Sequence, residues 1–226
     1  MTVSTYNSLK GVLKNISIST DTTLDMLINT LRSIKTENEV ECIVKAQRIA
    51  EDAFNNILKF IKVGVTEKEI ALELDFYMLR NGGEGLSFET IAVSGKNSSM
   101  PHGVPSNKKI ENGDFITMDF GTLINGYHSD MTRTVAVGFA TDEMKNVYDA
   151  VLNAQVNCLN NIKAGVSCKT GDEFARSVIR DAGFGQYFTH STGNGVGVEA
   201  LASIGAADWL NWLVLGTATG FTQGFA

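Results

Sequence analysis

Residues 114–138 read DFITMDFGTLINGYHSDMTRTVAVG, and this stretch decides how the middle of the chain folds. Two runs rich in β-forming residues flank the dipeptide Asn125-Gly126. An Asn-Gly pair between two such runs is a strong short-range signal for a β-hairpin with a tight primed turn. The sequence therefore predicts an antiparallel hairpin within this stretch.

Asp119 and Asp130 are the two carboxylates that such a hairpin places near each other. If Ile124-Asn125 form the turn, these residues lie directly opposite, with Cβ atoms about 4.5–5.5 Å apart. If Asn125-Gly126 form it, Asp119 faces Thr132, and Asp130 is its diagonal neighbour at about 7–8 Å. In both registers the two side chains leave the same face of the sheet, because side-chain direction alternates along a strand.

Two carboxylates that meet across strands repel each other unless a proton or a cation lies between them. Hydrolytic two-metal sites, whose ions are about 3.5–4 Å apart, use carboxylates of this kind. The competing interpretation is a solvated hairpin with two surface aspartates, because the spacing of Asp119 and Asp130 is a weak signal by itself. The surrounding sequence must therefore decide whether the pair is a metal site.

Helix starts are marked by three T-x-x-E capping boxes, at Thr36-x-x-Glu39, Thr66-x-x-Glu69 and Thr170-x-x-Glu173. We expect the first helix to end near Gly64, the second at Asn81-Gly82-Gly83 and the last at Gly183. Apolar residues at helical spacing over residues 147–162 predict a further long helix after the hairpin.

The chain repeats itself at an offset of about one hundred residues. Residues 61–65, IKVGV, are echoed by IKAGV at 162–166, and RNGGEG at 80–85 is echoed by RDAGFG at 180–185. We therefore predict an α+β fold of two pseudo-symmetric halves, each with two helices and an antiparallel hairpin. The counterpart of the hairpin would fall at 214–238, so we expect the second half to be incomplete.

Composition argues against two kinds of partner. A formal net charge of −6, without a Lys/Arg cluster, argues against nucleic-acid binding. The longest apolar stretch near the C-terminus, around Trp209 to Leu215, is far too short to span a membrane.

The three cysteines are widely spaced and odd in number, which is typical of reduced thiols: Cys42, Cys158 and Cys168. We therefore expect a cytoplasmic protein.

Six segments resemble the signature of one enzyme group: LRSIKTENEVE at 31–41, SFETIAVSG at 87–95, HGVPS at 102–106, GDFITMDFG at 113–121, GYHSDMTRT at 126–134 and FTHSTG at 188–193. The group is the Xaa-Pro aminopeptidases and prolidases of the pita-bread (M24-type) metallopeptidase family. The DMTRT form at 130–134 is closer to the Xaa-Pro branch than to the methionine aminopeptidases.

This resemblance implies a pita-bread fold and a site for two divalent ions, manganese, cobalt or zinc, which activate a water that attacks the amide bond before a proline. Asp119 and Asp130 match two metal ligands of the family. His102 and His190 match histidines that contact the Xaa-Pro peptide or stabilise charge in the transition state. His128 has no such match, and we interpret it as structural. A homodimer is among the assemblies that the resemblance allows.

The sequence departs from the family at several site positions. The family continues H-S-T-G with a ligand histidine, where this chain has Asn194, and an amide is a poor replacement for imidazole at a transition-metal site. Leu201 replaces another functional histidine, and no glutamate follows Glu199, although the two remaining family ligands are glutamates. Three of the five expected ligands are thus missing, and two carboxylates alone should bind a divalent ion weakly.

These observations predict three segments. Residues 1–30 resemble the remnant of an N-terminal domain or a linker, residues 31–199 form the pita-bread domain, and residues 200–226 are a divergent tail with one charged residue, Asp208. A chain truncated at both ends, or a frame-shifted reading, explains the tail, and a short paralogue is the alternative. We expect a metal-dependent exopeptidase that is impaired in this chain. A catalytically dead peptide- or protein-binding module is the alternative function.

Overall fold

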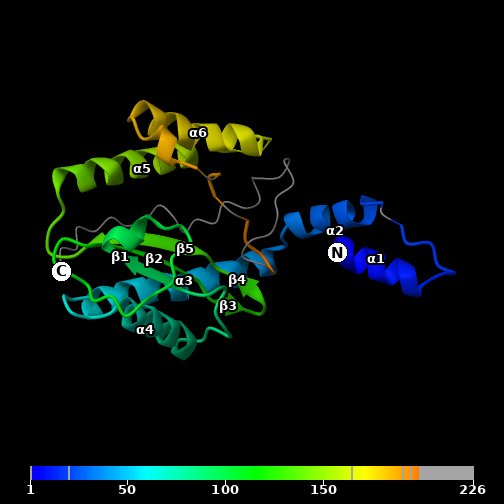
Figure 1. Cartoon of the computed structure of the whole chain (residues 1–226), viewed down its shortest axis with the longest axis horizontal. Coiled ribbons are helices and arrows are strands. Elements are labelled where there is room, and N and C mark those ends of the chain that lie inside the picture. Colours follow the sequence, from blue (N-terminus) through cyan, green and yellow to red (C-terminus); the bar gives the residue numbers. More distant parts are fainter. Residues whose placement is uncertain (1, 20, 164, 190, 194, 199–226) are drawn as a thin grey trace. The chain divides into compact units, whose positions relative to one another are not determined.

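The computed structural model describes residues 2–19, 21–163, 165–189, 191–193 and 195–198 (Figure 1). Contacts within the chain divide it into two compact units, Met1–Ile34 and Lys35–Ala226.

The first unit consists of two helices, α1 (Val3–Val12) and α2 (Thr23–Ser33). Helix α2 exposes several large apolar side chains: Leu24, Met26, Leu27, Ile28 and Leu31. Among the described residues, no helix combines the length and the apolar character needed to cross a membrane. The assignment of residues 1–30 to a separate N-terminal segment stays a prediction.

The second unit begins with the two helices that the first two capping boxes predict. Helix α3 spans Glu37–Phe60 and α4 spans Glu67–Arg80, and both boxes are formed. At α4 the backbone N–H of Thr66 donates to Glu69 Oε2 at 2.7 Å, while the N–H of Glu69 donates to Thr66 Oγ1 at 3.2 Å. Helix α3 ends earlier than expected, before Gly64, because Ile61 is already extended and buried in the core.

The predicted hairpin forms part of a three-stranded antiparallel sheet, whose strand order is β1-β2-β5. Its strands are β1 (Ile91–Ser94), β2 (Phe115–Phe120) and β5 (Met131–Ala136). A short two-stranded ribbon of β3 (Leu123–Ile124) and β4 (Tyr127–His128) extends the hairpin to its turn.

The turn occupies Asn125-Gly126. Asn125 has φ +51° and Gly126 has φ +76°, which are the positive values that a type I′ turn requires, and Ile124 pairs with Tyr127. Farther along, Asp119 pairs with Thr132. Of the two registers left open by the sequence, the one with a turn at Ile124-Asn125 is wrong. It would need positive φ at the β-branched Ile124, which is sterically unfavourable.

One face of the sheet packs on α3 and α4 and forms the main core. Ile116, Met118 and Phe120 of β2 are fully buried, whereas the alternate residue Asp119 lies on the other face and is only partly buried. The helices contribute small and aliphatic side chains to this core: Ala50, Ala53, Ile57, Ile70, Leu74 and Met78.

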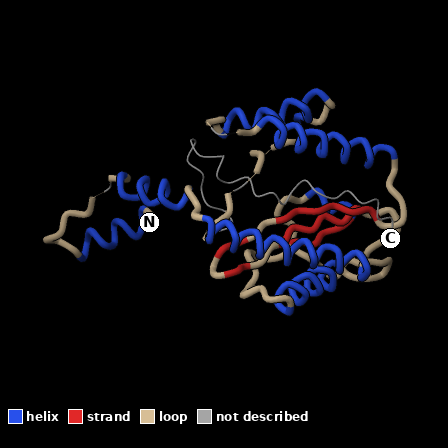
Figure 2. The backbone as a smooth tube through the Cα atoms, turned by 180° about the vertical axis from the view of Figure 1, so that it is seen from behind, coloured by secondary structure: helices blue, strands red, loops and turns tan. Residues whose placement is uncertain are grey.

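The third predicted helix is α5 (Asp142–Asn161), which pairs with α6 (Cys168–Asp181) around a smaller core of Ala154, Cys158, Ala175 and Ile179. In Figures 1 and 2, α5 and α6 lie on the side of the sheet opposite to α3 and α4. The aromatic ring of Tyr148 contacts that of Phe115 on β2, with centroids 6.3 Å apart.

The predicted capping box at Thr170-x-x-Glu173 is wrong. The N-cap of α6 is Ser167, whose hydroxyl accepts a hydrogen bond from Thr170 N at 3.2 Å, so the helix begins almost one turn earlier. Glu173 instead pairs with Arg180 at 2.8 Å. Ser167 comes two residues after Gly165, just as the N-cap Thr66 comes two residues after Gly64.

This correction makes the two halves more alike than the sequence suggested. Helices α4 and α6 are both 14 residues long, and the glycines before them, Gly64 and Gly165, both have positive φ near 90°. The predicted α+β fold with two related helix pairs is therefore confirmed. The expected position of the second hairpin, 214–238, lies outside the described residues.

Gly121 lies close to the backbone of the opposite hairpin strand. A Cβ atom at this position would lie 2.0 Å from the carbonyl oxygen of Ser129. We therefore expect Gly121→Ala to lower the free energy of unfolding by about 1–3 kcal/mol, because the two strands must move apart. Gly85→Ala is the matched control, since a Cβ there meets only Leu123 Cδ1 at 3.5 Å. Urea denaturation measures the unfolding free energy of both variants, and equal urea midpoints for Gly121→Ala and Gly85→Ala would contradict the prediction.

A hydrogen bond ties the hairpin to α3. Tyr127 Oη donates to Glu39 Oε1 at 2.6 Å. This bond, followed by those from Thr36, lowers the pKa of Glu39 from 4.5 to about 2. A lowered pKa stabilises the fold above pH 4.5, and this stabilisation is lost as the pH falls towards 2.

Tyr127→Phe should therefore lower the urea midpoint at neutral pH, and the difference from the wild type should shrink across this acidic range. Tyr187→Phe, at an exposed ring, is the control and should leave the urea midpoint unchanged both at neutral pH and across the acidic range. A difference between wild type and Tyr127→Phe that is independent of pH would show that Glu39 does not respond to this bond.

Candidate functional site

The structure places Asp119 and Asp130 side by side on the face of the sheet opposite to α3 and α4. Thr132 Oγ1 donates to Asp119 Oδ1 at 2.7 Å, and the side chains of Asp119 and Asp130 are hydrogen-bonded to each other. Two carboxyl groups in such contact need a proton or a cation between them. The pair that the sequence singles out is therefore formed, in the diagonal register.

Gly121 lies opposite Asp130 in the register of the hairpin. Phe120 pairs with Met131, so the next position along the same register sets Gly121 opposite Asp130. A Cβ atom at Gly121 would lie 2.0 Å from Ser129 O and 3.0 Å from Ser87 Oγ, so the close approach of the backbone requires glycine here.

Burial raises the pKa of Asp119 above its ordinary value. Hydrogen bonds with Thr132 and Asp130 and an electrostatic effect of His102 act in the opposite direction without cancelling it. The effect of His102 shows that this side chain lies within electrostatic reach of Asp119. A carboxyl group that burial makes costly to ionise is stabilised by any cation that joins the pair.

His102 reaches this face from a turn that folds over the sheet. Gly103 N donates to Met100 O at 3.1 Å, and His102 itself is exposed. Gly103 is buried, and a Cβ atom there would lie 2.8 Å from Val93 Cγ1. Since Val93 and Asp119 are on the same face of the sheet, close packing of Gly103 on Val93 directs the loop over the carboxylate pair.

His190 and Asn194 lie outside the described residues, as does Leu201, so the structure brings together only His102, Asp119 and Asp130. The described neighbours of His190 are well anchored, however. Phe188 O and Thr192 both bind an ion pair on α6, and this pair was not recognised from the sequence.

That ion pair consists of Asp172 and Arg176, which are one turn apart on α6 and joined by two hydrogen bonds of 2.6 and 3.2 Å. Asp172 Oδ1 accepts from the N–H and hydroxyl of Thr192 at 2.8 and 3.0 Å. Arg176 donates to Phe188 O at 2.7 Å and stacks on its ring. Arg176 is the largest cause of the lowered pKa of Asp172. The i, i+4 spacing of an acid and an arginine was the available sequence signal.

His128, interpreted as structural, connects the hairpin to the segment after position 194. Its backbone N–H donates to Gly197 O at 2.7 Å, next to the buried Val196. Its ring nitrogen Nδ1 is buried and has no hydrogen-bond partner within the part of the chain that the structure describes. The residues around Gly197 are thereby attached to the strand that precedes Asp130.

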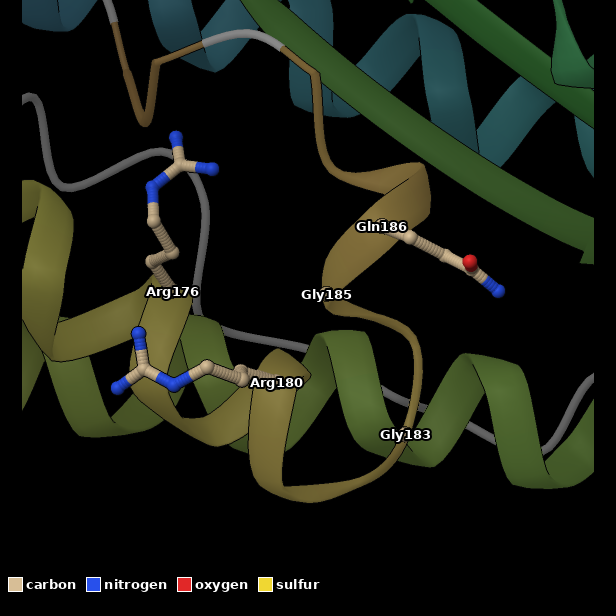
Figure 3. A pocket seen from close by; sticks show the side chains of 5 residues that line it. All are labelled: Arg176, Arg180, Gly183, Gly185 and Gln186. Carbon is tan, nitrogen blue, oxygen red and sulfur yellow. The ribbon is translucent and has the colours of Figure 1, made fainter.

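A surface hollow of about 490 Å³ lies between α6 and the 3-10 helix η2 (Gly185–Tyr187), and Asp119, Asp130 and His102 are not among its lining residues. Its lining residues are Arg176, Arg180, Gly183, Gly185 and Gln186 (Figure 3). The two arginines already pair with Asp172 and Glu173, so their charges are largely satisfied. The hollow is therefore not the candidate site.

The donor set decides how well a metal centre would fit. The paired oxygens of Asp119 and Asp130 suit a divalent cation. Within residues 2–198, leaving out the few that are not described, no group of three His, Cys, Asp or Glu side chains could hold a metal ion. The described residues therefore supply part of the ligand set of a metal centre and do not complete it.

Comparison with known proteins places this chain in a family. Residues 41–206 match the model of metallopeptidase family M24. The Xaa-Pro dipeptidase of Pyrococcus furiosus is 39% identical over 194 residues, which cover 86% of this chain and 56% of that protein. An uncharacterized peptidase of Bacillus subtilis, YqhT, is 43% identical over 205 residues, which cover 91% of this chain and 57% of that protein.

Solved structures agree in fold. The Xaa-Pro dipeptidase from Bacillus anthracis has a TM-score of 0.83 at 43% identity, over 92% of this chain and 58% of that one. The prolidase from Pyrococcus horikoshii has a TM-score of 0.84 at 35% identity, over 95% of this chain and 61% of that one. The chain thus spans less than two thirds of the length of these relatives. The predicted pita-bread fold is confirmed, and the chain belongs to metallopeptidase family M24.

Proposed function

We propose that this chain is the catalytic-type domain of an exopeptidase that releases the N-terminal residue from Xaa-Pro peptides, and that its hydrolytic activity is impaired. The observation that carries the proposal is the contact between Asp119 and Asp130, with His102 beside it. The names of the relatives from Pyrococcus furiosus and Bacillus anthracis, both Xaa-Pro dipeptidases, support the substrate class.

In this proposal, Asp119 and Asp130 hold a divalent ion, manganese, cobalt or zinc, between their carboxylates. Such an ion would supply a water activated for attack on an amide bond. His102 is exposed on its turn beside the pair, where it can contact the peptide near the bond to be cleaved. His190 is proposed to contact the same peptide from the second half.

Impairment is proposed because of the ligand set. Asn194 occupies the position at which the family has a ligand histidine, and an amide oxygen binds transition metals less well than imidazole does. Two carboxylates alone leave most of the coordination sphere of the ion open to water and buffer. The ion would therefore bind weakly and exchange readily.

A catalytically dead peptide-binding module is the second candidate. It is favoured by the lack of a three-ligand group among the described side chains.

The cytoplasm is the proposed compartment, because Cys42, Cys158 and Cys168 form no disulfide among the described residues. Nucleic acid is not a proposed partner, given the net charge of −6. A homodimer stays a prediction.

Metal binding tests the ligand assignment. We expect the chain to bind Mn²⁺ weakly in titration calorimetry, and Asn194→His to tighten binding by at least about tenfold, because imidazole adds a third good ligand. Asp119→Asn should abolish binding in both backgrounds. Asp142→Asn, at an exposed carboxylate on α5, is the control and should leave it unchanged. Equal Mn²⁺ affinity in wild type and Asp119→Asn would reject the assignment.

Peptide cleavage distinguishes the two candidate functions. We expect Mn²⁺ to stimulate slow release of alanine from an Ala-Pro dipeptide, and Asn194→His to accelerate it, because a more tightly held ion is present in more of the molecules. Chromatography of the released amino acid measures the rate. If neither protein cleaves at saturating Mn²⁺, while the wild type still binds Xaa-Pro peptides, the binding module is correct. A lack of both cleavage and binding would reject both functions.

A further inference from the structure

Glu67 is a buried carboxylate to which the sequence assigned no role. It is the first residue of α4, and its side chain has 0% exposure. One oxygen, Oε1, accepts from the N–H and hydroxyl of Ser94 at 2.7 and 2.9 Å and from Asn97 Nδ2 at 3.4 Å. The other oxygen, Oε2, accepts from the N–H and hydroxyl of Ser106 at 3.0 and 2.7 Å. Each oxygen therefore serves a different segment.

These two segments are the stems of the loop that carries His102. Ser94 ends β1, and Ser106 follows the His-Gly-Val-Pro motif, so residues 95–105 form the loop between them. Fixing both ends of a loop to one side chain removes much of its conformational freedom. Packing of Gly103 on Val93 then leaves the turn with His102 over the carboxylate pair.

The backbone of α4 binds the second stem as well. Glu67 N donates to Lys108 O at 3.0 Å, and Lys68 N donates to Ser106 O at 3.1 Å. These are N–H groups of the first helical turn, which lack partners within the helix. Because the backbone already anchors the second stem, the side chain of Glu67 is needed chiefly to attach the first stem to it.

The surroundings keep Glu67 ionised. Burial alone would raise its pKa, but hydrogen bonds from Ser106 and Ser94 outweigh burial and leave the pKa below the ordinary value. Lys108 Nζ lies just beyond, donating to Ser94 Oγ at 3.0 Å and to Asp114 Oδ2 at 2.6 Å. An ionised carboxylate accepts at both oxygens, and this is what the two stems require.

We propose that Glu67 is a positioning residue that clamps both stems of the 95–105 loop and thereby keeps His102 beside Asp119. The proposal deepens the proposed function and rests on it only for the role of His102. The placement of His102 is a structural claim that can be tested without turnover. A glutamine at position 67 would present one oxygen and one NH₂ group, so it could accept hydrogen bonds from only one stem.

Glu67→Gln in the full chain is the main test, with Glu37→Gln as the matched control. Glu37 is the first residue of α3, as Glu67 is of α4, but it is exposed. Both changes remove one negative charge from the first turn of a helix and alter the helix-dipole interaction alike. Only Glu67→Gln should increase amide hydrogen exchange in residues 95–105, by roughly tenfold or more. Exchange in α3 should stay unchanged in both variants.

The second readout is the coupling between His102 and Asp119. The chain has three histidines, so the ring signal of His102 can be identified in NMR spectra by its loss in His102→Gln. In the wild type and in Glu37→Gln, Asp119→Asn should shift this signal. In Glu67→Gln the same change should have less than about half that effect, because the loop no longer fixes the ring near position 119. General loss of stability would not produce this selective result.

Unchanged exchange in residues 95–105, together with an unchanged His102 response in Glu67→Gln, would overturn the proposal. If Glu67→Gln does not fold, Ser94→Ala serves instead, because it removes the hydroxyl by which the first stem donates to Glu67 Oε1 and should give smaller changes in the same two readouts. No change in that variant would also overturn it. Affinity for an Ala-Pro dipeptide is measured in parallel. If the wild type does not bind the peptide, the proposed function fails, while the exchange and NMR results still decide the role of Glu67.

Discussion

The tight turn at Asn125 and Gly126 is the constraint on which the candidate site depends. Both residues have positive φ, and the turn they form fixes every pair along β2 and β5. A slip of one residue would move the carboxyl groups to opposite faces of the sheet. The close approach at Gly121 reinforces this register, since a side chain at this position would collide with the carbonyl oxygen of Ser129.

Features with local signals could be predicted from the sequence. The capping boxes at Thr36 and Thr66 and the Asn-Gly turn each involve atoms only a few residues apart, and each forms as expected. The position of Asp130 relative to Asp119 followed once the turn was fixed, because side chains alternate along a strand. The same local reasoning failed at Thr170, where Ser167 competes as a capping residue and the helix begins earlier.

The anchors of the site could not be predicted in this way. Glu67 looks like an ordinary acid in the first turn of a helix, where negative charge is favourable in any case. Its actual partners, Ser94 and Ser106, are 27 and 39 residues away, and nothing local marks them. Only the packing of α4 against both stems excludes water from the carboxylate and makes these hydrogen bonds its sole means of solvation.

Each half anchors a loop to its second helix, but the two halves use different residues to do so. The internal repeat aligns Glu67 with Cys168, and a thiol cannot accept hydrogen bonds from two stems as a carboxylate does. In the second half, Asp172 lies one turn later on α6, where it binds Thr192 directly and holds Phe188 through Arg176. A helix that packs beside a sheet can therefore fix a neighbouring loop from more than one position along its length. For this reason the repeat could predict the paired helices, whereas the acid that anchors each loop had to be found in the structure.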